Sequence, residues 1–170
     1  SYSAKKLLKT VVKANLPTII DADGLNILAE NNFDLPKGVI LTPHPKEASR
    51  LLKVDTDEIL SDPERYAKEI SKKYNCVTVL KMHNTVVCSK DLEIYINTTG
   101  NSALAKAGSG DVLTGMIAGL TAQGMNLFDA AKLGVYLHGL CGEIASKELT
   151  EYSVMAHDLI NYIPKAIKLL

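Results

Sequence analysis

The stretch from Asn97 to Gly124 constrains this chain more than any other part of its sequence. It reads NTTGNSALAKAGSGDVLTGMIAGLTAQG and passes from the end of an apolar alternating run into an amphipathic helix. Gly108, Ser109 and Gly110 stand directly before that helix, where successive backbone N–H groups can turn toward one point. Because free N–H groups and the helix dipole attract negative charge, we expect an anion site here.

Asp111 follows at once and places a carboxylate beside the expected anion site, where it would repel a phosphate. One interpretation is an aspartate that only stabilises the start of its own helix. The other is a catalytic base that takes a proton from a hydroxyl group as a phosphoryl group arrives. The sequence Gly-Ser-Gly-Asp alone leaves both interpretations open, because Gly-rich segments before helices are common.

Length and composition describe an ordinary globular chain. Its 170 residues are 46% hydrophobic and 22% charged, which suits one domain with a buried core. The formal net charge is zero, which argues against a nucleic-acid or anionic-membrane partner, and no apolar run has membrane-spanning length. Cys76, Cys88 and Cys141 are scattered without metal-ligand spacing, so we expect buried reduced thiols and a cytoplasmic protein.

The order of the apolar segments predicts an α/β fold. The expected elements are a helix over 4–15, a strand over 17–21, a short helix to Glu30, a strand over 38–42, helices over 45–52 and 63–74, three strands between 76 and 96, and helices over 111–123, 127–149 and 154–169. Only two or three turn-like residues separate the last three strands, which is typical of a β-meander. We predict a mainly parallel sheet with a β-meander, covered by helices on both faces.

Two polar clusters follow the predicted parallel strands, at the sheet edge where open α/β sheets bind ligands. The first contains Asp21, Asp23 and Asn26, which either cap the next helix or contact a ligand. The second is centred on His44, which two flanking prolines hold in an extended conformation. His44 can cap the following helix with Glu47 at its third position, so this histidine is either structural or a ligand contact.

A third polar segment lies between the first two meander strands. It consists of Lys81, Met82, His83, Asn84 and Thr85. From the residues alone it is a hairpin turn exposed to solvent.

The longer segment GN-x-x-LAKAGSGDVLTGMIAGLTAQG resembles the signature of ribokinase-like enzymes, and within them that of the nucleotide-dependent NAD(P)H-hydrate dehydratases. The resemblance covers nearly all 170 residues but corresponds to the later part of the family's domain. We therefore expect one partial ribokinase-like domain over residues 1–170, with its N-terminal part missing. The resemblance implies an anion hole at Gly108, Ser109 and Gly110, with Asp111 as the catalytic base.

The three polar segments are similar to the family's as well. DAD-x-LN and HP-x-E border its substrate site, and a Lys-Gly-x-x-Thr segment lines its nucleotide site. The resemblance assigns substrate contacts to Asp21, Asp23, Asn26, His44 and Asp111, and nucleotide contacts to Lys81, Met82, His83, Asn84, Thr85 and Gly110. Two positions depart from the family pattern, since Lys46 and Met82 stand where glycine is usual, and a side chain at 82 hinders close backbone approach.

The resemblance implies an enzyme that uses ADP or ATP to return hydrated NAD(P)H to NAD(P)H. Mg²⁺ would come with the nucleotide phosphates, without a metal site of the protein's own, and the enzyme would be a homo-oligomer, a tetramer by resemblance. His138 and His157 receive no chemical role, and His138 is expected to be a core residue. The alternatives are a small-molecule kinase of the hydroxyethylthiazole or hydroxymethylpyrimidine type, and a nucleotide-binding module without catalysis.

Overall fold

The computed structural model describes residues 2–31 and 33–170, which form two compact units. The N-terminal unit ends at Ile96, and the C-terminal unit begins at Asn97. The boundary lies just before the segment that the sequence singles out. The single partial domain remains a prediction.

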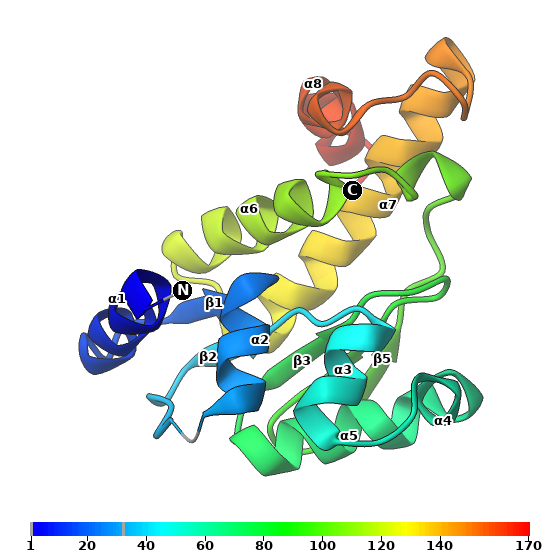
Figure 1. Ribbon diagram of the computed structural model, residues 1–170. Helices are drawn as coiled ribbons and strands as arrows, with labels where there is room; N and C mark the ends of the chain where they lie inside the picture. The colour runs from blue at the N-terminus through cyan, green and yellow to red at the C-terminus, as the bar shows by residue number, and fades with distance from the viewer. Residues whose placement is uncertain (1, 32) are drawn as a thin grey trace. The chain divides into compact units, whose positions relative to one another are not determined.

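The N-terminal unit contains helices and five short strands (Figure 1). In chain order they are α1 (Tyr2–Lys13), β1 (Thr18–Ile20), α2 (Asp23–Glu30), β2 (Val39–Leu41), α3 (Pro45–Leu52), α4 (Thr56–Ser61), α5 (Pro63–Tyr74), β3 (Val77–Leu80), β4 (Val86–Cys88) and β5 (Ile94–Ile96). The predicted bounds of α3 and α5 are confirmed. Helix α4 was not expected, because its six residues bury only Ile59 and are too short to show helical periodicity.

The five strands form one mixed sheet in the order β1-β2-β3-β4-β5. β1 pairs with β2 and β2 with β3 in parallel, whereas β3–β4 and β4–β5 are antiparallel. The β-meander is therefore confirmed, but only two of the four pairings are parallel. The reason is that a parallel pair needs a long crossover, and only two connections here contain helices that cross back between neighbouring strands.

The helices of this unit and the sheet share a core of large apolar side chains. Leu25 and Leu28 of α2, Leu51 of α3 and Ile70 of α5 are at most 2% exposed, and Leu41 of β2 is fully buried. Each of these helices turns one apolar stripe inward, as their amphipathic sequences require. This core fixes the strands whose ends carry the polar clusters.

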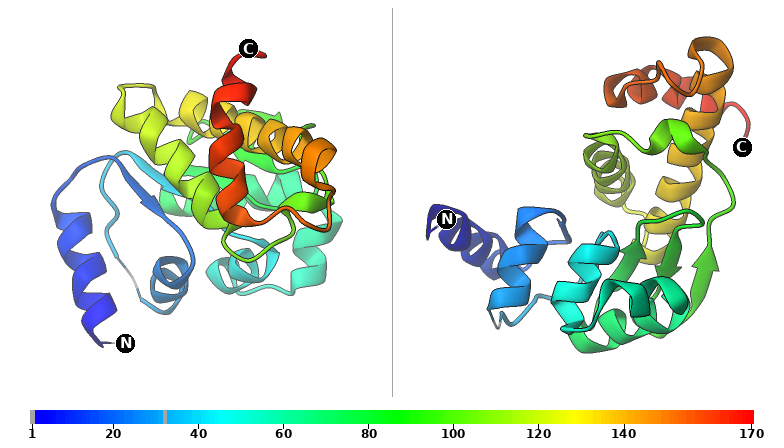
Figure 2. Two further views of the ribbon diagram at one scale, coloured as in Figure 1. Left: turned by 90° about the horizontal axis from the view of Figure 1, so that it is seen from above. Right: turned by 45° about the vertical axis from the view of Figure 1, so that its right-hand side comes forward.

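The C-terminal unit is helical. It contains the 3₁₀ helix η1 (Ser102–Leu104), α6 (Ser109–Ala122), α7 (Leu127–Leu149) and α8 (Ala156–Ile167). Helices α6 and α8 both pack against the long helix α7 (Figure 2). Their shared core includes Leu137 and Cys141 of α7 and Leu159 of α8.

Local residues determine where α6 ends and α7 begins. Gly124, at φ 92°, follows the last residues of α6, and the N–H groups of Gly124 and Met125 donate to carbonyl groups of its final turn. The Asn126 side chain accepts a hydrogen bond from the Asp129 N–H at 2.9 Å and so caps α7. None of the helices in residues 2–31 and 33–170 is long and apolar enough to cross a bilayer.

Cys76 gives a pH-dependent prediction for the N-terminal unit. Burial raises the pKa of its thiol from 9.0 to about 12. Between these values the unfolded chain loses the thiol proton while the folded unit keeps it, so the free energy of unfolding should fall as pH rises above 9. The loss from this thiol rises from about 0.7 kcal/mol per pH unit at pH 9 toward about 1.4 at higher pH.

Urea unfolding at pH 9 and pH 10 measures this loss, with Cys76→Ala as the matched control. The wild-type protein should lose about 1 kcal/mol more than Cys76→Ala over this interval, because the unfolded thiol is already half ionised at pH 9. Equal losses in the two proteins would contradict the prediction.

Candidate active site

Three polar segments meet at one edge of the N-terminal unit's sheet because β1, β2 and β3 are parallel. Asp21 follows β1, Thr42 follows β2 and Lys81 follows β3. Two backbone hydrogen bonds tie these segments together beyond the strand ends. The Thr42 N–H donates to the Ile20 carbonyl at 3.2 Å, and the Lys81 N–H donates to the Pro43 carbonyl at 2.8 Å.

An ion pair joins the outer two of these segments. Lys81 Nζ lies 2.6 Å from Asp21 Oδ1, and the two side chains are only 19% and 13% exposed. Since β2 lies between β1 and β3, this pair spans the middle strand. The resemblance assigns Lys81 to the nucleotide and Asp21 to the substrate. Their direct contact was not predicted from the sequence.

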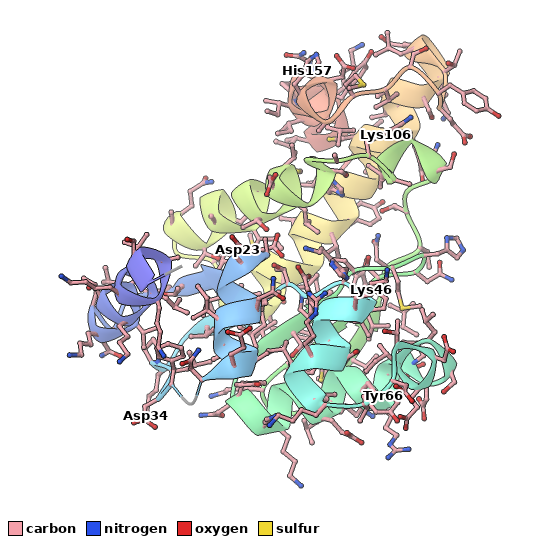
Figure 3. The ribbon with its side chains drawn as sticks, in the orientation of Figure 1. Asp23, Asp34, Lys46, Tyr66, Lys106 and His157 are labelled. Carbon is pink, nitrogen blue, oxygen red and sulfur yellow. The ribbon has the colours of Figure 1, made fainter. Side chains whose placement is uncertain are left out.

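Helix α2 begins with strained backbone. Ala22, just before its first residue, has φ 47° and ψ −120°, a conformation that favours glycine and costs roughly 1–3 kcal/mol for other residues. The Gly24 N–H closes this turn by donating to the Asp21 carbonyl at 2.9 Å. Asp23 is the first residue of α2 and is exposed, and Figure 3 shows it at the same end of the unit as Lys46 of α3.

Asn26, on the next turn of α2, is hydrogen-bonded to Arg50, which was not among the predicted site residues. Its Oδ1 accepts a hydrogen bond from Arg50 Nη1 of α3 at 2.8 Å. An arginine one turn from a helix end is common on protein surfaces, so no sequence signal distinguished Arg50.

His44 caps α3 as expected. Its Nδ1 accepts from the Lys46 N–H at 3.1 Å and lies 3.4 Å from the Glu47 nitrogen, while Glu47 Oε2 accepts from the His44 N–H at 2.8 Å. A ring that accepts at Nδ1 carries its proton on Nε2 when it is neutral. The side chain is 45% exposed, and its Nε2 lies 3.5 Å from Glu47 Oε1, so Glu47 faces both the backbone and the ring of His44.

The turn after β3 is closed by Thr85. Its hydroxyl donates to the Met82 carbonyl at 3.1 Å, and Asn84 adopts φ 57°. Met82 is not among the residues with positive φ, so its backbone does not require the glycine usual in the family. Its side chain packs against the apolar core, while His83 and Asn84 are exposed.

In the C-terminal unit, Gly108 immediately precedes α6 with φ 87° and ψ −13°. The Ser109 N–H donates to the Lys106 carbonyl at 3.2 Å. Within the described part of the chain, the N–H groups of Gly110 and Asp111 have no hydrogen-bond acceptor, and no side chain caps the helix. N–H groups without acceptors at a helix start favour a bound anion, and the anion site itself stays a prediction.

Ser109 is also bonded through its side chain. Its Oγ lies 3.1 Å from Nε2 of His138 on α7, and both residues are buried. Burial of His138 was expected, but its contact with the first residue of α6 was not. The two positions are 29 residues apart, and no local pattern pairs them.

Asp111 is the third residue of α6 and is exposed. A carboxylate in the first turn of a helix is stabilised by the dipole. The geometry therefore offers two N–H donors and an adjacent carboxylate, an arrangement able to hold a phosphoryl group beside a base.

Comparison with known proteins gives consistent matches along the chain. The family model described as NAD(P)H-hydrate dehydratase matches residues 1–165. A bifunctional NAD(P)H-hydrate repair enzyme of Moorella thermoacetica is 41% identical over 167 residues, which are 96% of this chain and 31% of that protein.

Solved structures agree. The ADP/ATP-dependent NAD(P)H-hydrate dehydratase of Bacillus subtilis, co-crystallised with ATP and Mg²⁺, matches with a TM-score of 0.91 and 37% identity over 99% of this chain and 60% of that one. A ribokinase-like superfamily protein of Enterococcus faecalis matches with a TM-score of 0.83 and 30% identity, covering 99% and 59%. The fold is thus ribokinase-like α/β, and the chain spans less than two thirds of these proteins.

The Asp21–Lys81 pair gives a prediction about stability. Removing one member leaves the other charge largely buried, so Lys81→Met and Asp21→Asn should each lower the free energy of unfolding by about 2 kcal/mol. The double variant should lose clearly less than the sum of the two.

The Asp129–Lys132 pair, at 2.7 Å, is the matched control, because its side chains are more exposed, at 49% and 31%. Its double-mutant cycle should give a coupling energy below about 1 kcal/mol. Urea unfolding of both sets measures the two coupling energies. Equal coupling in the two cycles would show that burial adds nothing to the Asp21–Lys81 pair.

Proposed function

Because this chain belongs to the NAD(P)H-hydrate dehydratase family, we propose that the whole protein converts hydrated NAD(P)H to NAD(P)H with ADP or ATP as co-substrate. The observation that carries the proposal is the start of α6, where two N–H groups without acceptors adjoin the Asp111 carboxylate in a chain matched by this family over residues 1–165.

The reaction needs phosphorylation because hydroxide is a poor leaving group. The ring hydroxyl oxygen of the hydrated cofactor attacks the terminal phosphoryl group of the nucleotide, and the bond from that phosphorus to its bridging oxygen breaks. The hydroxyl proton passes to Asp111. The lone pair of the ring nitrogen then expels phosphate, and loss of a proton from the neighbouring ring carbon gives NAD(P)H.

The start of α6 supplies the electrostatic part of this proposal. Gly108 turns the chain, and the N–H groups of Gly110 and Asp111 neutralise charge on the transferred phosphoryl group. Ser109 belongs to the same turn, but its own N–H and hydroxyl are bonded to Lys106 and His138. Its part in the anion hole is thus to shape the backbone.

The sheet edge of the N-terminal unit supplies the binding part. The proposed substrate contacts are the half-exposed ring of His44 together with Asp21, Asp23 and Asn26. The turn formed by Lys81, Met82, His83, Asn84 and Thr85 is the proposed nucleotide contact. The support for both assignments is their position after parallel strands, where ligands of α/β sheets bind.

Mg²⁺ is assigned to the nucleotide. Within the described residues, no group of three or more His, Cys, Asp or Glu side chains could hold a metal ion. In the proposal Mg²⁺ would arrive with the nucleotide, because it prefers phosphate oxygens and water as ligands. No step above depends on it.

We also propose that the whole protein has further structure beside β1 and forms a homo-oligomer. β1 is an edge strand, and Leu7, Val11 and Leu16 are 65%, 40% and 63% exposed. An open strand edge and exposed apolar side chains are usually covered in a complete protein. The 170-residue chain alone would then bind nucleotide poorly or without turnover.

To test the proposed function, the full-length protein is given hydrated NADH with ADP or ATP, and the formation of NADH is measured. Recovery of NADH with release of phosphate supports the proposal. A phosphorylated product that accumulates without NADH would instead indicate a small-molecule kinase, and nucleotide binding without turnover would indicate a binding module.

Asp111→Asn separates the two interpretations of this residue. Asparagine keeps the size of aspartate and removes only a charge that stabilises the helix dipole by about 0.3–1 kcal/mol, so the variant should stay folded. Loss of a general base should lower the turnover number by about 10²–10⁴-fold. Nucleotide affinity should hold or increase, because a negative charge beside the phosphates is removed.

Asp129→Asn is the matched control, since Asp129 is also the third residue of its helix and lies on α7. Turnover and nucleotide affinity are measured for both variants in the full-length protein. Equal turnover in Asp111→Asn, Asp129→Asn and the wild type would leave Asp111 as a helix-stabilising residue only.

A further inference from the structure

One face of α7 holds the segment that leads into α6. Thr99 Oγ1 donates to the Tyr136 carbonyl at 2.9 Å, and the Gly100 N–H donates to Glu143 Oε1 at 2.7 Å. One turn further along, Asn101 Nδ2 donates to Ser146 Oγ at 2.8 Å. Successive residues of the segment are thus fixed to the same helix.

Glycines on α7 make this contact close. A Cβ at Gly139 would lie 2.0 Å from Thr99 Oγ1 and 2.7 Å from the Thr99 carbonyl carbon. A Cβ at Gly142 would lie 2.7 Å from Leu104 Cδ2. Because the segment lies directly on the helix surface, α7 acts as a template for its path.

The segment leaves α7 after η1 and returns to it at Ser109. Residues 105–108 between them include two exposed residues, Ala105 and Ala107, and end in the left-handed turn at Gly108. At the far end of this short bridge, Ser109 Oγ lies 3.1 Å from His138 Nε2. This bond fixes the residue from which α6 begins.

We propose that His138 is a positioning residue for the phosphoryl-binding turn. By holding Ser109, it sets the direction of the next two N–H groups, those of Gly110 and Asp111, and the place of the Asp111 carboxylate. A histidine that is 7% exposed needs a polar partner, and Ser109, at 4%, needs one equally. The proposal rests on the proposed function only in taking α6 as the site of the nucleotide phosphates.

Two substitutions at His138 test the role. His138→Leu removes the bond to Ser109 and should weaken binding of ADP alone roughly five- to thirty-fold, with a loss of turnover at saturating nucleotide. His138→Gln places an amide group the same number of bonds from Cβ and should restore ADP affinity to within about threefold of the wild type. Ser109→Ala should reproduce the effect of His138→Leu, and the double variant should add little to either.

Amide hydrogen exchange gives a readout that needs neither nucleotide nor turnover. The Ser109 N–H donates to Lys106 and the Val112 N–H to Gly108, both in the first turn of α6. In His138→Leu these two amides should exchange on the order of tenfold faster, and His138→Gln should return them toward the wild-type rate.

Leu137→Val is the matched packing control, because Leu137 is a buried neighbour of His138 on the same helix. It should lower the unfolding midpoint but leave ADP affinity and the exchange of Ser109 and Val112 unchanged. Wild-type exchange and ADP affinity in His138→Leu would overturn the proposal. So would equal losses in His138→Gln and His138→Leu.

If His138→Leu does not fold, Ser109→Ala and His138→Gln still test the proposal. Wild-type ADP affinity and wild-type amide exchange in Ser109→Ala would overturn it. Failure of the proposed function gives a different pattern. The full-length wild type would then bind ADP but not recover NADH from its hydrate, while ADP affinity would still depend on His138.

Discussion

The parallel pairing of β1, β2 and β3 is the constraint on which the polar segments of the N-terminal unit depend. Parallel neighbours require crossovers that return the chain in the same direction, so the segments after all three strands lie at one edge. The bonds from Thr42 to Ile20 and from Lys81 to Pro43 extend this alignment past the strands. The Asp21–Lys81 ion pair then fixes the outer segments across β2.

The C-terminal unit organises its own candidate residues in another way, around a helix start that no side chain caps. Most helices satisfy their first N–H groups with a side chain, and loss of such a cap costs about 1 kcal/mol. In α6 the residue at that place is Gly108, which has no side chain and turns through φ 87°. The unit gives up a local stabilising bond at the position where an anion can replace it.

Sequence reasoning located most elements but not the bonds between them. The start of α5 at Pro63, the capping of α3 by His44 and of α7 by Asn126 are local signals, so they are visible within a few residues. The sheet was expected to be mainly parallel because the meander was counted as an addition to it, when it supplies half of the pairings.

The missed contacts share one physical reason. Asp21 and Lys81 are 60 residues apart, and Ser109 and His138 are 29 apart. A sequence shows which residue types are present, whereas tertiary packing decides which of them meet. His138 was correctly expected to be buried, but burial alone does not say which polar group satisfies a histidine.

These contacts change what the candidate residues can offer a ligand. His44 uses Nδ1 to cap α3, and its Nε2 lies 3.5 Å from Glu47 Oε1, so a ligand that binds Nε2 must share it with this carboxylate. The N–H and the hydroxyl of Ser109 are both hydrogen-bonded within the protein. The N–H groups of Gly110 and Asp111 are therefore the ones that can donate to a ligand. Lys81 already neutralises Asp21, so its ammonium group presents less net charge to a phosphate than a free lysine would. The residue types at these positions suit the family's chemistry, and the bonds they already make determine which atom of each remains for it.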